Sequence, residues 1–177
     1  MHNMKKYLLT AMTLGVIAAS GAAIIGLTNL ITKDKILENE ANKVKAGIVT
    51  LFGSEAEIKK EQSVTDYKYV NYAYTITNAT STLDAYAFRT TGSNSYGKIS
   101  LLIGFKKVAT DYKFEAVSII VDEQTFASTL EDNYISTIND GSRNIEDVTC
   151  GATYGATLVR DMIKDAQSVI ASGILEG

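Results

Sequence analysis

The residues best suited to chemistry lie in one short run near the C-terminal end, from Asp147 to Thr153 (DVTCGAT). This run stands where a loop leads into a helical pattern. Helix N-termini bind anions because free backbone N–H groups and the positive end of the helix dipole face the ligand. Gly151 permits close backbone approach, Ala152 is too small to shield a phosphate, and Thr153 places a hydroxyl in the first turn. The run therefore predicts an anion site, with an ordinary helix start capped by Thr149 or a neighbouring residue as the alternative.

The composition excludes several classes of enzyme. The chain of 177 residues has a single Cys, Cys150, and a single His, His2. A disulfide framework needs paired Cys, and a zinc site needs a cluster of ligands. A hydrolytic triad would have to use His2, beside an apolar segment. We therefore predict no catalytic acid–base residue and no metal site, and the net charge of −3 argues against a nucleic-acid surface.

An uncharged apolar stretch runs from Tyr7 to Ile31. As a helix it would extend roughly 37 Å, enough to cross a hydrocarbon core of about 30 Å. We predict that residues 1–31 form a short cytoplasmic end and a single transmembrane helix, and that residues 32–177 form one extracytoplasmic domain. The basic pair Lys5-Lys6 favours a cytoplasmic N-terminus. A cleaved signal peptide, with small residues at 18–22 for cleavage, is the alternative.

The rest of the chain predicts an α+β domain with a mainly antiparallel sheet and packed helices. Alternation in the first strand puts Val70, Tyr72, Tyr74 and Ile76 on one face. Apolar spacing and Gly stops define the helices. The predicted helices are Thr32–Phe52 and Ala152–Ser172, and Phe126–Ile138 is predicted as a short helix or an irregular layer. The predicted strands are Tyr67–Ile76, Ala85–Arg89, Ile99–Phe105 and Phe114–Val121, and the predicted turns are Thr91–Ser95 and Ala109–Tyr112.

The run ending at Thr153 resembles the flavinylation motif D-x-x-[S/T]-G-A-T of the FMN-binding domain family. This domain occurs in the G subunit of Rnf complexes and in the C subunit of sodium-pumping NADH:quinone reductases. In that family a flavin transferase takes FAD and esterifies the FMN phosphate to the last Thr of the motif. The resemblance makes Thr153 the site of covalent FMN, with Gly151, Ala152 and Cys150 as further cofactor-binding residues and Asp147 and Thr149 as motif positions.

Two positions depart from the motif. Cys150 stands where Ser or Thr is usual, and a thiol is a weaker hydrogen-bond donor than a hydroxyl. Gly155 stands where a second hydroxyl residue often follows. Gly155 also begins a second G-A-T run that ends at Thr157, but the position of the motif Asp is then occupied by Gly151. Thr157 is therefore the poorer acceptor.

The resemblance extends to the predicted strands. Ala85–Phe88 and Tyr96–Gly104 are similar to the family pattern G-Y-x-F … G-Y-G-x-I-x-L-x-x-G. Many members then carry an E-T-P-G loop near the flavin, where this chain has Glu123–Phe126, and Thr125 is the corresponding candidate flavin contact. The short chain is more similar to the Rnf subunit than to the longer quinone reductase subunit.

The resemblance implies a membrane-anchored electron carrier. Such a protein would act with other membrane subunits of an Rnf-like complex that couples ferredoxin oxidation and NAD reduction to ion transport, with little or no activity alone. A flavin transferase would be a partner during maturation. A stand-alone surface flavoprotein and a non-redox anchored binding domain are the alternatives.

Overall fold

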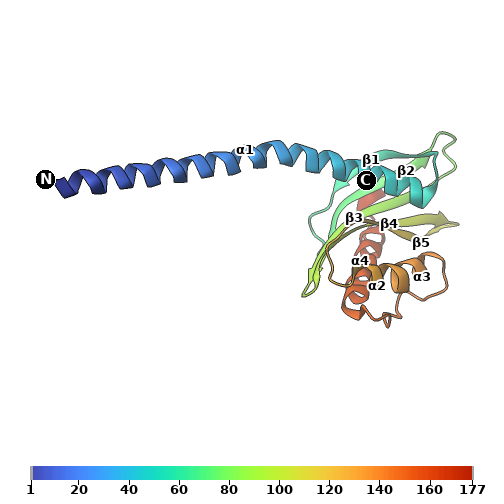
Figure 1. Ribbon diagram of the computed structural model, residues 1–177. Helices are drawn as coiled ribbons and strands as arrows, with labels where there is room; N and C mark the ends of the chain where they lie inside the picture. The colour runs from blue at the N-terminus through green and yellow to red at the C-terminus, as the bar shows by residue number, and fades with distance from the viewer. Residues whose placement is uncertain (1, 177) are drawn as a thin grey trace. The chain divides into compact units, whose positions relative to one another are not determined.

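The computed structural model (Figure 1) describes the backbone of residues 2–176. The side chains of residues 2–6, 8–10, 24, 28–34, 36, 37 and 176 lie outside the described part. Contacts divide the chain into two compact units, Met1–Asn42 and Lys43–Gly177. The boundary predicted between residues 31 and 32 is the point where the chain leaves the membrane. A division by contacts does not test that boundary, so the boundary stays a prediction.

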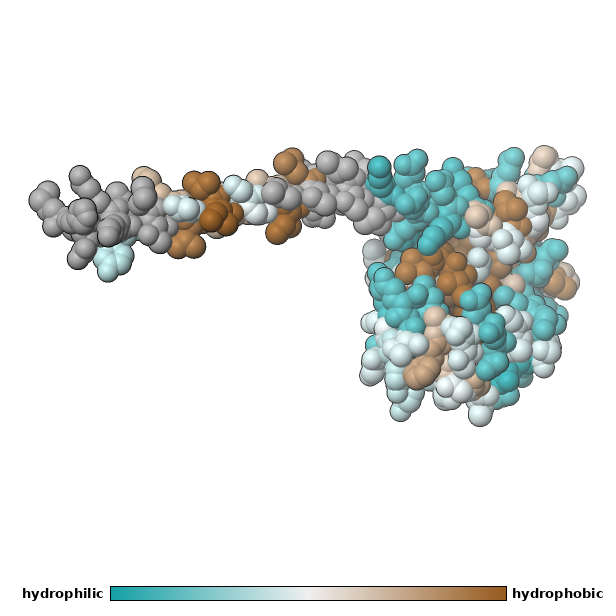
Figure 2. Space-filling model, viewed as in Figure 1, coloured by the Kyte–Doolittle hydropathy of each residue, from teal (hydrophilic) through white to brown (hydrophobic). Residues whose placement is uncertain are grey.

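The N-terminal unit is helical, and helix α1 (His2–Phe52) begins in it. Its described large apolar side chains, among them Met12, Val16 and Ile25, are exposed, and Figure 2 shows brown apolar groups along this part of the helix. Across the described residues, no helix has both the length and the apolar content expected of a membrane span. The predicted span, Tyr7–Ile31, includes side chains outside the described part, at residues 8–10, 24 and 28–31.

The second unit is built on an antiparallel sheet. Its described residues form five strands in the order β1-β2-β3-β4-β5, each paired with the next along the chain. The strands are β1 (Ala56–Ser63), β2 (Val70–Asn78), β3 (Ala85–Asn94), β4 (Gly97–Val108) and β5 (Asp111–Asp122). The helices that follow are α2 (Ala127–Leu130), a π-helical segment (Glu131–Ile135), α3 (Ser136–Asn139), α4 (Thr153–Ala171) and a 3-10 turn (Ile174–Glu176). The predicted α+β class is confirmed.

Side chains on the two faces of the sheet belong to separate apolar clusters. Val44, Ile48 and Leu51, from the last turns of α1, pack in one cluster with the sheet residues Tyr74 and Leu102. The other cluster joins α4 and α2–α3 to the opposite face. Its fully buried members include Phe88, Phe105, Leu130, Tyr134, Val159 and Met162. The sheet is therefore the middle layer of this unit, and α4 is fixed to one of its faces.

Close backbone approach fixes α4 to the sheet. A Cβ on Gly92 of β3 would lie 2.8 Å from Leu158 Cδ1, so a larger residue there would force the Leu158 side chain to shift. Further along α4, one carboxylate oxygen of Asp165 accepts the backbone N–H groups of Tyr69, at 2.6 Å, and Val70, at 3.2 Å. The helix is thus held both by apolar packing and by a charge-assisted bond to the start of β2.

The sheet differs from the sequence prediction in three places. The sequence does not predict strand β1, because half of its residues (AEIKKEQS) are charged and the strand is largely exposed at the edge of the sheet. The predicted turn at Thr91–Ser95 is mostly strand, since β3 continues to Asn94. A register shift between Val70 and Tyr72 changes the face of the sheet to which the side chains of β2 point. Val70 therefore packs in the cluster with α4, while Tyr74 packs in the cluster with α1. The single-face stripe predicted for β2 is therefore wrong at Val70.

The edge strand β5 is covered by the side chain of Asn139, the last residue of α3. The Val117 N–H donates to Asn139 Oδ1 at 2.7 Å, and Asn139 Nδ2 donates to the Val117 carbonyl at 2.9 Å. The amide imitates a neighbouring strand and fastens α3 to the sheet.

We predict that Asn139→Ala destabilises the domain, because it leaves both backbone polar groups of the buried Val117 without partners. The free energy of unfolding should fall by roughly 1–3 kcal/mol. Urea unfolding of the full chain, followed by tyrosine fluorescence, measures the loss. Asn71→Ala is the matched control, since Asn71 is exposed on the sheet. Equal stability of the two variants would show that Asn139 does not fasten α3.

Candidate functional site

The motif run ends in a turn that leads directly into α4. Gly151 has φ +84°, a left-handed conformation that favours glycine. Ala152 is the N-cap residue and is buried, and Thr153 is the first residue of α4 and is exposed. Among the described residues, no side chain makes a capping hydrogen bond to the start of α4. The predicted alternative, a start capped by Thr149 or a neighbour, therefore does not hold, and the first amides remain free of a side-chain cap.

A pocket of about 320 Å³ opens at this helix start. Three segments far apart in the sequence form its walls: the β3–β4 turn, the loop between β5 and α2, and the first turn of α4. The lining residues are Tyr96, Gln124, Phe126, Leu130, Gly151, Ala152, Thr153, Tyr154 and Gly155. The pocket thus brings the predicted residues Gly151, Ala152 and Thr153 together with six residues that the sequence analysis had not assigned to the site.

Aromatic rings surround the pocket and remain exposed to solvent. Tyr96 lies between the other two, with its ring centroid 5.6 Å from that of Phe126 and 5.5 Å from that of Tyr154. The exposed fractions are 37% for Tyr96, 48% for Phe126 and 69% for Tyr154. Exposed aromatic rings beside a cavity offer flat apolar surface to a planar ligand. Nothing local marks this cluster in the sequence, since its members stand 30 and 28 residues apart along the chain (96, 126 and 154).

The loop between β5 and α2 is held to the β3–β4 turn. A Cβ on Gly97 would lie 2.1 Å from the Glu123 carbonyl oxygen, so only glycine permits this contact. Gln124 is 7% exposed and its Nε2 donates to the Gly97 carbonyl at 2.6 Å. The predicted contact residue Thr125 is exposed, and its hydroxyl donates to the Tyr96 carbonyl at 3.1 Å. Gln124 lines the pocket and Thr125 does not, and the contact of Thr125 with a flavin stays a prediction.

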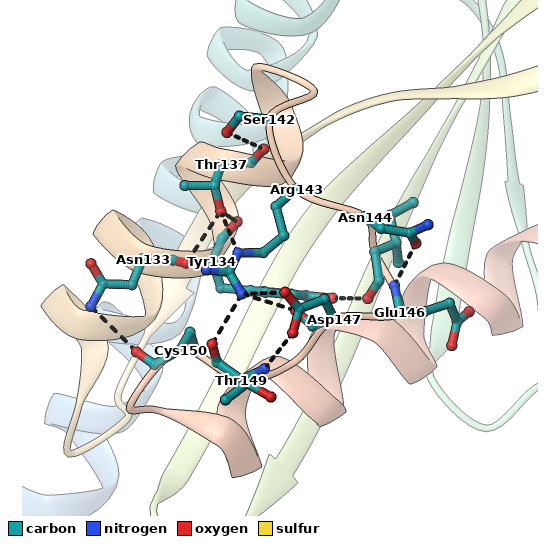
Figure 3. A network of polar contacts seen from close by, with 11 residues as sticks. Asn133, Tyr134, Thr137, Ser142, Arg143, Asn144, Glu146, Asp147, Thr149 and Cys150 are labelled. Atoms are coloured by element: carbon teal, nitrogen blue, oxygen red, sulfur yellow. Dashed lines mark hydrogen bonds and ion pairs between the residues drawn. The ribbon is translucent and has the colours of Figure 1, made fainter.

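The other motif residues lie in the loop that precedes the pocket (Figure 3). One oxygen of the Asp147 carboxylate accepts from Arg143 Nη1 at 3.1 Å, and the other accepts the Thr149 N–H at 3.2 Å. Cys150 is buried, and its carbonyl accepts from Asn133 Nδ2 at 3.3 Å. Asp147, Thr149 and Cys150 are not pocket residues; their contacts shape the loop.

Gly155 explains one departure from the motif. It is buried in the first turn of α4, and a Cβ there would lie 3.0 Å from Leu130 Cδ2. A hydroxyl residue there would require the Leu130 side chain of α2 to shift. Thr157, in the second run, is half-buried one turn further along α4 and does not line the pocket.

Potential metal ligands do not gather in the described part of the chain. Within it, no group of three or more His, Cys, Asp or Glu side chains could hold a metal ion.

Comparison with known proteins adds one finding. Residues 1–48 match the family model for the RnfG N-terminal region. This match confirms the predicted resemblance to the G subunit of Rnf complexes for that part of the chain, which precedes the sheet and the pocket. No curated protein and no solved structure matches the chain.

We predict that Gly155→Val destabilises the domain by roughly 1–3 kcal/mol, because the added methyl groups overpack the contact with Leu130. Gln167→Val is the matched control, since Gln167 is exposed on the same helix and loses only helix propensity, at most about 0.7 kcal/mol. Urea unfolding of the full chain compares them. A Gly155→Val variant as stable as the control would show that the Leu130 side chain of α2 can move aside without a measurable loss of stability.

Proposed function

We propose that the chain is a membrane-anchored electron carrier that holds FMN as a phosphoester on Thr153, within an Rnf-like complex. The observation that carries this proposal is the position of Thr153. Its side chain stands exposed at the uncapped start of α4, beside a pocket with an aromatic rim. The likeness of the run from Asp147 to Thr153 to a flavinylation motif supports the same residue from the sequence.

The residues of the pocket suit both ends of FMN. At the start of α4, backbone N–H groups without a side-chain cap and the positive helix end favour the negative charge of a phosphate. The rings of Tyr96, Phe126 and Tyr154 suit an isoalloxazine, which is flat and largely apolar. A pocket volume of about 320 Å³ lies within the usual range for sites of small ligands.

Attachment from FAD would form one bond and break one. The Thr153 hydroxyl oxygen would bond to the phosphorus of the FMN half, the pyrophosphate bond would break, AMP would leave, and the hydroxyl proton would pass to a base. We assign this base to the transferase. FMN would supply the redox chemistry, since a flavin accepts and releases either one electron or two.

The chain's own part in electron transfer is to position and retain the flavin. A covalent link to the first turn of α4 fixes the phosphate end, while the aromatic rim limits the positions that the ring can take. Retention matters outside the cytoplasm, where FMN that dissociates is not replaced. This role needs no acid–base residue of the chain itself.

The wider setting follows from the N-terminal region. The match of residues 1–48 to the RnfG N-terminal region supports a place beside the other membrane subunits of an Rnf-like complex, and so favours this role over a stand-alone flavoprotein. The uncharged stretch Tyr7–Ile31 supports a single-pass anchor. In such a complex the electrons would pass between ferredoxin and NAD and drive ion transport, with the domain on the extracytoplasmic side.

We predict that Thr153→Ala abolishes covalent flavin, because the acceptor oxygen is lost. Thr157→Ala should retain it, because Thr157 lies one turn into the helix and away from the pocket. Both variants should stay folded, within about 0.5 kcal/mol of the original stability. The measurement is flavin fluorescence in a denaturing gel after co-expression with a flavin transferase. Undiminished fluorescence in Thr153→Ala would refute the assignment.

We also predict that the domain is exposed outside the cell. The basic pair Lys5-Lys6 should keep the N-terminus in the cytoplasm, while a long domain crosses regardless of its own charge. Protease added to right-side-out vesicles should digest residues 32–177 without detergent. A domain that is cut only after the membrane is opened would have the opposite orientation.

A further inference from the structure

We propose that Arg143 is a positioning residue for flavin attachment and that the motif residue Asp147 acts through it. The proposal rests on the proposed function, since it concerns the loop that presents Thr153. Arg143 lies four residues before the motif and does not line the pocket. Its side chain is 23% exposed, against 56% for that of Asp147.

The Arg143 guanidinium joins the motif loop to α3 (Figure 3). On the loop side, Nη1 donates to Asp147 Oδ2 at 3.1 Å and to the Thr149 carbonyl at 3.0 Å. On the helix side, Nε donates to Thr137 Oγ1 at 3.1 Å. The nitrogens of a planar guanidinium point in different directions, so Arg143 can donate to the motif loop and to α3 at the same time. A lysine ammonium, with one nitrogen, cannot span both groups in this way.

The helix side of this contact is itself fixed. Thr137 Oγ1 lies 2.9 Å from the Tyr134 carbonyl, to which it donates, and the backbone N–H of Arg143 donates to the Thr137 carbonyl at 3.0 Å. The ring of Tyr134 is fully buried, its hydroxyl donates to the Ile145 carbonyl, and burial raises the pKa of this hydroxyl, so it stays a donor. Arg143 therefore ties the motif loop to a rigid part of the core.

The loop side controls the backbone just before the acceptor. Arg143 holds the Thr149 carbonyl, Asn133 holds the Cys150 carbonyl at 3.3 Å, and the next residue is Gly151 in its left-handed turn. Two successive carbonyls are thus fixed immediately ahead of the turn that starts α4. Loss of the Arg143 hydrogen bonds would let the loop adopt other conformations. A smaller fraction of the chains would then present Thr153 to the transferase in the correct position.

Both oxygens of the Asp147 carboxylate accept hydrogen bonds within the same network. One oxygen accepts from Arg143 and the other accepts the Thr149 N–H. From these contacts, the role of Asp147 in the motif is to hold the loop in its conformation. The competing role, direct contact between an exposed Asp147 and the transferase, would not involve Arg143.

The test uses the full chain as the substrate of its flavin transferase with FAD, and measures kcat and KM for attachment. Arg143→Ala and Asp147→Ala should each raise KM about tenfold with kcat retained, since a smaller competent fraction weakens apparent binding by that factor. The double variant should be no worse than either single one, because the two residues act as a unit. Arg143→Lys should raise KM by less.

Lys164→Ala is the matched control. Lys164 forms an ion pair at 2.9 Å with Glu146, the residue before the motif, and its loss should leave KM unchanged. Deuterium uptake at the Thr149 amide provides a second measurement, because Asp147 accepts that N–H. Uptake should rise in Arg143→Ala and Arg143→Lys and stay unchanged in Lys164→Ala.

The outcomes separate this proposal from the proposed function. A normal KM in both Arg143→Ala and Arg143→Lys, with a raised KM in Asp147→Ala, would overturn the positioning role alone. Additive losses in the double variant would also overturn it. If Arg143→Ala fails to fold, the KM of Arg143→Lys and its deuterium uptake at the Thr149 amide decide whether Arg143 positions the loop. No flavin on the unaltered chain would overturn the proposed function, and this inference with it.

Discussion

The close packing of α4 on the sheet determines where Thr153 can be. Gly92 of β3 lets Leu158 approach closely, and Asp165 fastens the far part of the helix to the start of β2. Because α4 cannot slide or tilt without breaking these contacts, its first turn has a fixed position beside the β3–β4 turn. Gly155 adds the same constraint against Leu130 of α2. At the pocket itself, the contacts of Gly97 with Glu123 and of Gly155 with Leu130 bring the walls together.

The chemistry of the pocket follows from what this packing leaves unsatisfied. A helix start without a side-chain cap keeps backbone donors free for an anion, and this cost is tolerated more readily at an exposed site. The exposed rings of Tyr96, Phe126 and Tyr154 lie together, and a clustered apolar surface of this kind is typical of a ligand or partner site. Both features occur at the pocket that Thr153 lines. A phosphate on that hydroxyl and a planar ring against the rim would satisfy them together.

Much of the fold was predictable from the sequence, and the limits have physical causes. Apolar residues spaced three and four apart predicted the end of α1 and α4, because a helix buries one face at that spacing. The charged strand β1 carried no such signal, since an edge strand is defined by backbone pairing and not by burial. The shift at Val70 also escaped, because a bulge changes the facing of side chains without a mark in composition.

The candidate site was predictable only where residues are neighbours in sequence. The run from Asp147 to Thr153 is local, so a motif could reveal it. The aromatic rim and Gln124 come from segments that only the folded sheet brings together. Arg143 was missed for a related reason: its partners include Thr137 on α3, and nothing in the sequence marks that contact.

The most direct measurement is the intact mass and peptide map of the chain isolated from its own host. Flavin attachment predicts a single adduct with the mass of FMN less one water, confined to the peptide that contains Thr153 and stable to denaturation. A chain of unmodified mass, or an adduct mapped to Thr157, would contradict the assignment of Thr153 as the flavin-bearing residue.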